Sequence, residues 1–524
     1  MLQDNHRLLA TVAVLLVVFL GPGSRTARCE ASVFWGGLSP GPHLVGFEAV
    51  EKYDYSRTFR EKYYYDGVPY DGERARPIQI CVWYPASPRD DATPLVLSEY
   101  LFPLPEDSRF FDILSQLQAR ELGSLFGLLG NNRALVQDMI NLPVSAVSEA
   151  PRLAGTFPLV VYFANSQTGI SEDAVLCEYL ASHGFIVATS HSLGAVGLTP
   201  DMLPLDVEAT VRDRELVLGH MRDYSNVNPD RVGLIGRGYG GLGALIMQMR
   251  NSDVDAVAAV DPLFTYRPLL EFAAGSPFYD ATRMQVPLMI AYPSGVDEMF
   301  DKSLVEDLPY SDRCFFGFPM ARRQNLSSYG IVAAIGLDTT GAADISSPSY
   351  EAFCRHTLDF MKAYLLDDSS SLESLNSPAM GAGDIVASVL PASTPPPTEA
   401  QFSRLIEADR IEKAVDIFYQ LKKSDPDLVI FQEATLNALG YNLLTANRLR
   451  EAAIIFKLNT EAYPNSANVW DSYADACIAS GDTQAAITCY ERVLEVLPGD
   501  SAVGPGIREI LQNNATQGLE RLRQ

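Results

Sequence analysis

The sequence is poor in cysteine and in positive charge. Seven cysteines are spread over 524 residues, without the close spacings of a disulfide-stapled scaffold or a zinc site. We therefore expect no metal and no cofactor, and mostly buried thiols, with one unidentified disulfide left open. The formal net charge is −25, which repels phosphate backbones and anionic lipids. This excludes nucleic acid as an expected partner.

No apolar run is long enough to be a clear membrane span, which needs about 18 or more residues. The N-terminal run 8–20 follows His6 and Arg7 and ends at a Gly-Pro-Gly break. This pattern predicts a signal peptide over 1–28 and a secreted or periplasmic protein; an uncleaved anchor is the alternative. Cys29 follows Arg28 rather than a small residue, which disfavours lipid attachment.

What is abundant is apolar and aromatic surface, at 47% and 10% of residues, in a chain long enough for two domains. Composition changes divide it into five segments. These are the predicted signal peptide at 1–28, an irregular extension at 29–75, an α/β domain at 76–366 with a helical insertion at about 105–147, a polar and proline-rich linker at 367–397, and a repeat domain at 398–524.

The α/β domain is predicted from alternating strands and helices, which build a mostly parallel sheet covered on both faces. Predicted strands are 77–85, 159–163, 185–189, 232–235, 254–260, 287–292 and 330–335, and the clearest helices are 174–183 and 207–222. The insertion shows helical spacing over 106–142. It is either a lid over a site or an ordinary packing insertion.

The C-terminal segment repeats itself at the tetratricopeptide period of about 34 residues, in copies 433–466 and 467–500. The signature positions hold Leu439, Gly440, Ala452, Phe456 and Pro464 in one copy and Trp470, Tyr473, Ala474, Ala486, Tyr490 and Pro498 in the next. A partial earlier copy contains Ala414, Phe418 and Pro426. We expect an all-α solenoid whose groove binds a protein or peptide.

A strand followed by a Gly-rich turn and a helix is typical of the nucleophile elbow, in which G-x-S-x-G exposes a serine. The segment 232–241 has this form, with Gly236 and Gly240 flanking the turn. Its central position is Gly238, which has no side chain to attack a carbonyl.

Four segments, 76–85, 157–162, 178–188 and 228–236, resemble the plasma-type platelet-activating-factor acetylhydrolases and related dienelactone-hydrolase-like proteins. The resemblance implies an α/β-hydrolase fold over about 41–366. It also implies that Asp261 occupies the position of the catalytic acid and Thr339 that of the histidine. Threonine cannot exchange a proton near neutral pH as imidazole can. Without that imidazole, Asp261 is expected to fix a loop or cap a helix.

Other residues offer weaker candidates for chemistry. Ser192 follows a strand and is a candidate displaced nucleophile, with His191 either its base or a surface hydrogen-bonding group. His356 is expected in helix packing, and Asp297 is an alternative acid position.

The loop containing Asn165 and Ser166 lies at the oxyanion-loop position, and the NH of Tyr239 is the expected second donor. This cradle can bind an acyl or ester group without a nucleophile. The sequence thus predicts a non-catalytic, ligand- or protein-binding pseudo-hydrolase; the alternative is an active carboxylic-ester or acetyl-ester hydrolase with a displaced nucleophile.

Overall fold

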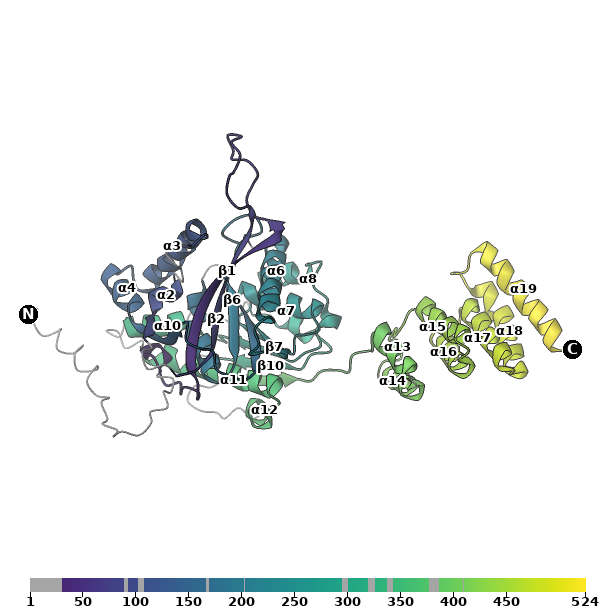
Figure 1. Ribbon diagram of the computed structural model, residues 1–524. Helices are drawn as coiled ribbons and strands as arrows, with labels where there is room; N and C mark the ends of the chain where they lie inside the picture. Colours follow the sequence, from purple (N-terminus) through teal and green to yellow (C-terminus); the bar gives the residue numbers. More distant parts are fainter. Residues whose placement is uncertain are drawn as a thin grey trace, which may run out of the picture. The chain divides into compact units, whose positions relative to one another are not determined.

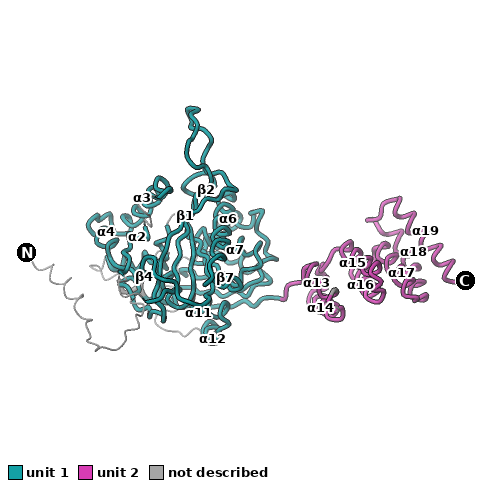
Figure 2. The backbone as a smooth tube through the Cα atoms, in the orientation of Figure 1, with its two compact units in different colours: residues 1–393 teal, residues 394–524 magenta. Residues whose placement is uncertain are grey.

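The computed structural model describes residues 31–88, 93–101, 108–165, 169–201, 203–294, 300–318, 326–336, 343–376, 386–408 and 410–524. The chain forms two compact units, Met1–Ser393 and Thr394–Gln524 (Figure 2). The predicted signal peptide lies outside the described residues. Within them, no helix is long and apolar enough to cross a membrane.

An eleven-stranded sheet forms the centre of the first unit, in the order β11-β10-β9-β8-β7-β5-β6-β2-β1-β4-β3. The neighbours from β6 through β5, β7, β8 and β9 to β10 are all parallel, and β2 is antiparallel to both β1 and β6. The strands are β1 (Leu44–Thr58), β2 (Ala75–Ala86), β3 (Pro94–Val96), β4 (Pro143–Ser148), β5 (Phe157–Phe163), β6 (Ile186–Ser190), β7 (Val227–Arg237), β8 (Ala256–Val260), β9 (Leu288–Tyr292), β10 (Arg313–Gly317) and β11 (Val386–Leu390).

Helices cover both faces of this sheet, as the alternating pattern predicts (Figure 1). One apolar core contains α5 (Ala174–Ser182) and α11 (Ala343–Leu365), and the other contains α6 (Pro204–Met221) and α7 (Tyr239–Arg250). The remaining helices are α2 (Leu97–Leu101), α3 (Phe111–Leu128), α4 (Arg133–Ile140), α8 (Arg267–Ala274), α9 (Ser303–Glu306), α10 (Ser328–Gly336) and α12 (Ser369–Asn376). The parallel strands are buried on both sides, which explains their continuous apolar runs.

The segment expected to be an irregular extension instead contains the longest strand of the sheet. Strand β1 pairs with β2 from Leu44 to Thr58 and buries Val45 and Phe47. Its outer half is partly exposed and mixes acidic residues with tyrosines. The alternation of apolar and polar residues along this strand is therefore weak, and the strand depends on its hydrogen bonds to β2.

The strand predicted at 330–335 is wrong, because these residues lie in helix α10. Ile331 and Val332 are buried, and a short buried apolar run fits either structure by periodicity alone. The last parallel strand is β10.

The linker predicted at 367–397 is also partly wrong, since it contains α12 and β11. Strand β11 pairs with the outer edge of β10, with Arg313 opposite Leu390 and Gly317 opposite Val386. Pairing satisfies backbone groups that an open edge would expose.

The insertion is helical, with α3 and α4, but it ends before residue 147. Strand β4 pairs with β1 through Ala146, so residues 143–147 belong to the sheet. The six described cysteines are all buried and unpaired, which confirms the expectation of buried thiols: Cys81, Cys177, Cys314, Cys354, Cys477 and Cys489.

The second unit consists of helices, namely α13 (Glu399–Glu407), α14 (Ile411–Ser424), α15 (Glu433–Thr445), α16 (Leu449–Ala462), α17 (Ala467–Ser480), α18 (Thr483–Val496) and α19 (Pro505–Leu522). The pairs α15/α16 and α17/α18 begin at corresponding positions of the two predicted copies. Gly440 lies against Phe456, whose ring is 2.5 Å from where a Cβ on residue 440 would be.

Candidate functional site

Three residues lie within two positions of the carboxyl ends of neighbouring parallel strands, and therefore at one edge of the sheet. Asn165 comes after β5, Gly238 after β7 and Asp261 after β8. Ligands of open α/β sheets bind outside the carboxyl ends of the strands. This edge is the candidate site.

Gly238 forms the turn between β7 and α7, with φ 54° and ψ −117°. Residues that have a side chain rarely adopt this backbone conformation, because their Cβ atom crowds the adjacent carbonyl. The flanking glycines allow the helix to approach closely: a Cβ on Gly236 would lie 2.6 Å from the Gly240 carbonyl oxygen, and one on Gly240 would lie 2.4 Å from that of Phe163. The backbone thus has the form of a nucleophile elbow.

The carboxamide of Asn165 fills the space where a side chain at position 238 would begin. Its Oδ1 lies 3.0 Å and its Cγ 3.1 Å from the place of a Cβ on Gly238. A side chain there would displace this amide.

A cavity of about 250 Å³ opens beside this turn. The insertion contributes Ser124 and Leu128 of α3. The other residues lining it are Asn165, Glu172, Arg237, Gly238, Asp261, Leu263, Ser327 and Tyr329. Helix α3 therefore forms one wall of the candidate site, a position that both interpretations of the insertion allow.

Arg237 is held in place by a buried ion pair that the sequence did not reveal. Its guanidinium donates from Nε and Nη2 to Asp173, at 2.7 Å for Nη2 to Oδ1, and from Nη2 also to the carbonyl of Leu326. The Tyr162 hydroxyl donates to the same carboxylate at 2.6 Å. Despite burial, the pKa of Arg237 lies well above its usual value because of the carboxylates of Asp173 and Glu172.

Asp261 lies at the site but is engaged in its own loop. It has φ 43°, its NH donates to the Ala291 carbonyl at 2.7 Å, and its Oδ1 accepts from the Tyr266 hydroxyl. These contacts favour the loop-fixing interpretation of this carboxylate.

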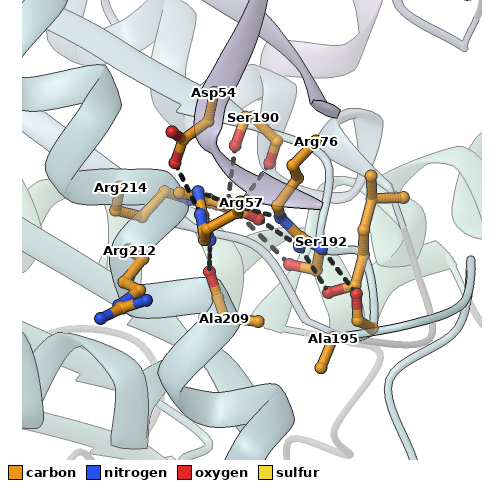
Figure 3. A network of polar contacts seen from close by, with 12 residues as sticks. Asp54, Arg57, Arg76, Ser190, Ser192, Ala195, Ala209, Arg212 and Arg214 are labelled. Atoms are coloured by element: carbon orange, nitrogen blue, oxygen red, sulfur yellow. Dashed lines mark hydrogen bonds and ion pairs between the residues drawn. The ribbon is translucent and has the colours of Figure 1, made fainter. Parts of the chain in front are cut away.

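Ser192 is part of a buried polar network centred on arginines (Figure 3). Its hydroxyl donates to the Ala164 carbonyl at 3.2 Å and accepts from Arg214 Nη2 at 3.4 Å. Arg214 also binds the Ser190 hydroxyl and carbonyl. No hydrogen bond joins Ser192 to His191 in the described part of the chain.

The network continues into the first two strands of the sheet. Asp213 of α6 accepts from Arg76 of β2 at 2.6 Å and from Arg57 of β1 at 2.8 Å. Arg76 also donates to the Gly194 carbonyl at 2.7 Å. The loop that holds Ser192 is thus fixed by charged hydrogen bonds, which are suited to a structural role.

His191 is buried, so its interpretation as a surface group was wrong. Burial, followed by the charges of Arg120 and Arg214, lowers its pKa to about 3 and keeps the imidazole neutral. Its Nδ1 lies 4.0 Å from Glu121 Oε1, too far for a hydrogen bond.

Glu121 of α3 connects the insertion to the segment before α5 and, through Ser171, to α10. Its Oε2 accepts from the Ser171 hydroxyl at 2.7 Å, and Ser171 is 2.7 Å from the Tyr329 hydroxyl of α10. Burial raises the pKa of Glu121 to about 8, against the opposing effect of Ser171. A Cβ on Gly169 would lie 0.8 Å from Glu121 Oε1, so this contact requires glycine there. The only sequence signal for the Glu121 contact was a glutamate within an apolar helical stripe.

His356 packs against Phe316, with ring centroids 4.8 Å apart, as expected for a residue of helix packing. Ser166, Asp297 and Thr339 lie outside the described residues. The assignment of Thr339 assumed a strand at 330–335, which is α10. The segment that follows the last parallel strand is 318–327, and it contains no histidine. In the described ranges, no cluster of three or more His, Cys, Asp or Glu could hold a metal ion.

Across the sheet the strands run in the order β1, β2, β6, β5, β7, β8, β9 and β10, and among these β2 alone is antiparallel to its neighbours. This arrangement resembles the α/β-hydrolase fold. Among solved structures, the chain is similar to a ferulic acid esterase from Streptomyces cinnamoneus, with 18% identity, a TM-score of 0.48, and coverage of 67% of this chain and 98% of that one. No protein-family model and no curated protein matches the sequence. The fold assignment therefore rests on the sheet topology itself.

Proposed function

We propose that this protein is a pseudo-hydrolase, whose α/β unit binds an acyl-bearing ligand in the cavity beside Gly238 without hydrolysing it. The observation that carries the proposal is the turn itself. It keeps the backbone of a nucleophile elbow, yet residue 238 has no side chain and Asn165 occupies the space above it.

The neighbouring groups support binding rather than turnover. No histidine lines the cavity as the structure describes it, so no imidazole there can accept a proton from a hydroxyl. The first NH of α7 belongs to Tyr239 and has no acceptor within its own helix. Such a donor stabilises a carbonyl oxygen whether or not a reaction follows.

The displaced nucleophile is a weaker alternative. Arg214 donates to the Ser192 hydroxyl, and the Ser192 proton is directed at the Ala164 carbonyl. A neutral His191 without a hydrogen bond to Ser192 cannot activate it as a general base does.

Labelling with a fluorophosphonate probe and hydrolysis of nitrophenyl acetate test the proposal. We expect no labelled serine and no turnover above a blank from the purified full chain. Labelling that disappears in Ser192→Ala but persists in Asp261→Ala would show a displaced active site and would contradict the proposal. The two variants are suitable because Ser192 and Asp261 belong to different loops.

We further propose that the helical unit is a tetratricopeptide array that binds a protein or peptide, and that the chain is exported. Two features support the array: the 34-residue offset from the start of α15 (Glu433) to that of α17 (Ala467), and the glycine at position 440 beneath Phe456. Export is supported by the N-terminal sequence 1–28. N-terminal sequencing of the secreted protein tests cleavage of that segment.

A further inference from the structure

Two buried cysteines face each other between α17 and α18. Cys477 of α17 and Cys489 of α18 are each 2% exposed and belong to the same apolar cluster of the helical unit. Their thiols share a hydrogen bond, which the Cys489 thiol donates to the Cys477 sulfur. The fold therefore brings together two of the seven cysteines of the chain, a pairing that their spacing in the sequence does not reveal.

The turn between the two helices sets this contact. Gly481 ends α17 in the left-handed conformation, at φ 80°, and Asp482 caps α18 by accepting from the Ala485 NH at 3.0 Å. With so short a connection, the helices form an antiparallel hairpin and pack against each other (Figure 1). A helical side chain leans towards the N-terminus of its own helix. Cys477 thus leans away from the turn and Cys489, which is farther from it, leans towards it, so the two sulfurs converge.

The two thiols differ in a way that suits disulfide exchange. The hydrogen bond from Cys489 lowers the pKa of Cys477, against the opposing effect of burial, and the same hydrogen bond raises the pKa of Cys489. The thiolate is the nucleophile of exchange, and its attack is faster when more of it is present. Cys477 is therefore suited to attack first and Cys489 to attack second.

We infer that Cys477 and Cys489 form a disulfide bond that links α17 to α18 when the chain meets a disulfide oxidant such as oxidised glutathione. Exported proteins meet oxidants of this kind in their compartments. The inference nevertheless depends neither on export nor on ligand binding in the first unit, because the oxidant can be added to the purified chain and both residues lie in the helical unit.

The bond forms in two exchanges. The Cys477 thiolate attacks one sulfur of the oxidant, which gives a mixed disulfide and releases one glutathione thiolate. The Cys489 thiol then loses its proton to solvent, attacks the Cys477 sulfur and releases the second glutathione thiolate. The two cysteines together lose two electrons, and the oxidant gains them. Because both sulfurs are buried, the first attack requires a local opening of the hairpin.

Peptide mapping of the full chain tests the bond. The purified chain is held overnight with oxidised glutathione, and its free thiols are then alkylated in denaturant. Trypsin leaves both cysteines in one peptide, 458–492, because no Lys or Arg lies between Lys457 and Arg492. We expect this peptide to be free of alkylation and lighter by two hydrogen atoms than its reduced form. Asp-N protease cleaves before Asp482 and should give two peptides that stay joined until a reductant is added.

Two substitutions distinguish this pair from the other cysteines. In Cys489→Ala, glutathione should remain on Cys477, because no second thiol displaces it; an unmodified Cys477 would contradict its role as the attacking thiol. Cys314→Ala, at a buried cysteine of the first unit, is the control and should form the bond as wild type does. Alkylation of both cysteines in peptide 458–492 of the treated wild type, or a bond from either one to a different cysteine, would overturn the inference.

The bond should also stabilise the helical unit. It closes the loop from residue 477 to residue 489, and such a constraint on the unfolded chain usually raises stability. We expect the oxidised chain to show a melting temperature of the helical unit about 5–10 °C above that of the reduced chain, by circular dichroism. An unchanged or lower melting temperature with the bond in place would refute its role in linking the two helices.

Discussion

At the turn after β7, the backbone conformation and the Asn165 side chain together restrict residue 238. The φ of 54° disfavours any residue with a Cβ, and Asn165 Oδ1 would lie 3.0 Å from that atom. Active hydrolases of this fold hold a serine in the same strained turn. Placing a hydroxyl at residue 238 therefore requires more than one substitution.

Gly238→Ser alone should create no esterase activity and should destabilise the first unit by about 1–3 kcal/mol, the usual cost of a strained backbone. Urea unfolding and nitrophenyl acetate turnover measure the two effects. Gly219→Ser is the control, because a Cβ there meets nothing within 4 Å; we expect a change of about 0.5 kcal/mol or less beyond helix propensity. Measurable turnover by Gly238→Ser would contradict this prediction.

Glu121 should make stability depend on pH. Its pKa is about 8 in the folded chain and 4.5 in the reference state. Between these values the folded state binds one more proton, so the free energy of unfolding falls as pH rises, by at most about 1.4 kcal/mol per pH unit. The stabilisation that comes from protonated Glu121 is fully present below pH 4.5, and above pH 8 no more of it is lost.

Urea unfolding of wild type and Glu121→Gln at about pH 5, 6.5 and 8 measures this dependence. The stability of the variant relative to wild type should increase with pH. Glu271→Gln, at an exposed carboxyl, should keep the wild-type slope. Parallel pH profiles for wild type and Glu121→Gln would refute the prediction.

At the scale of elements, close contacts between helices depend on small residues. Gly440 of α15 faces the Phe456 ring of α16, and both residues are buried. A methyl group at position 440 would have to displace a ring that fills the space between the helices.

Gly440→Ala should therefore destabilise the helical unit by about 1–3 kcal/mol, although alanine favours an isolated helix by about 1 kcal/mol. Gly506→Ala in α19 is the matched control, because nothing lies within 4 Å of its Cβ position; it should be neutral or stabilising. Thermal unfolding followed by circular dichroism distinguishes the two. Equal effects of both substitutions would show that packing at Gly440 is unimportant.

The contact of α3 with the segment before α5 and with α10 belongs to the same scale. Glu121, Ser171 and Tyr329 come from α3, the segment before α5, and α10. Helical spacing in the insertion indicated an apolar face, but it could not indicate that a carboxyl group would be buried in that face.

At the scale of the whole molecule, the first unit extends beyond the boundary that composition suggests. Helix α12 packs on α11, with Leu375 buried, and β11 covers the edge of β10. The division of the chain falls after Ser393 rather than at 366.

A fragment that ends at residue 393 should fold as a soluble unit, whereas one that ends at residue 366 should aggregate, because the edge of β10 is then unpaired. Size-exclusion chromatography and light scattering compare the two, with identical N-termini. The fragment 394–524 should unfold at the temperature of the corresponding transition in the full chain, since each unit has its own core. A monomeric, cooperatively folded fragment ending at 366 would refute the role of β11.

The sequence by itself determined the α/β alternation, the glycine turn at 236–241 and the period of the C-terminal helices, because local spacing controls each of these. The tertiary structure decided the pairing of β1 and β11, the helical state of 328–336, and the burial of Glu121 and His191. These depend on contacts between residues far apart in the chain, such as Arg237 with Asp173 or Glu121 with Ser171. Local sequence does not encode such partners, since they are brought together only when the sheet and its helices pack.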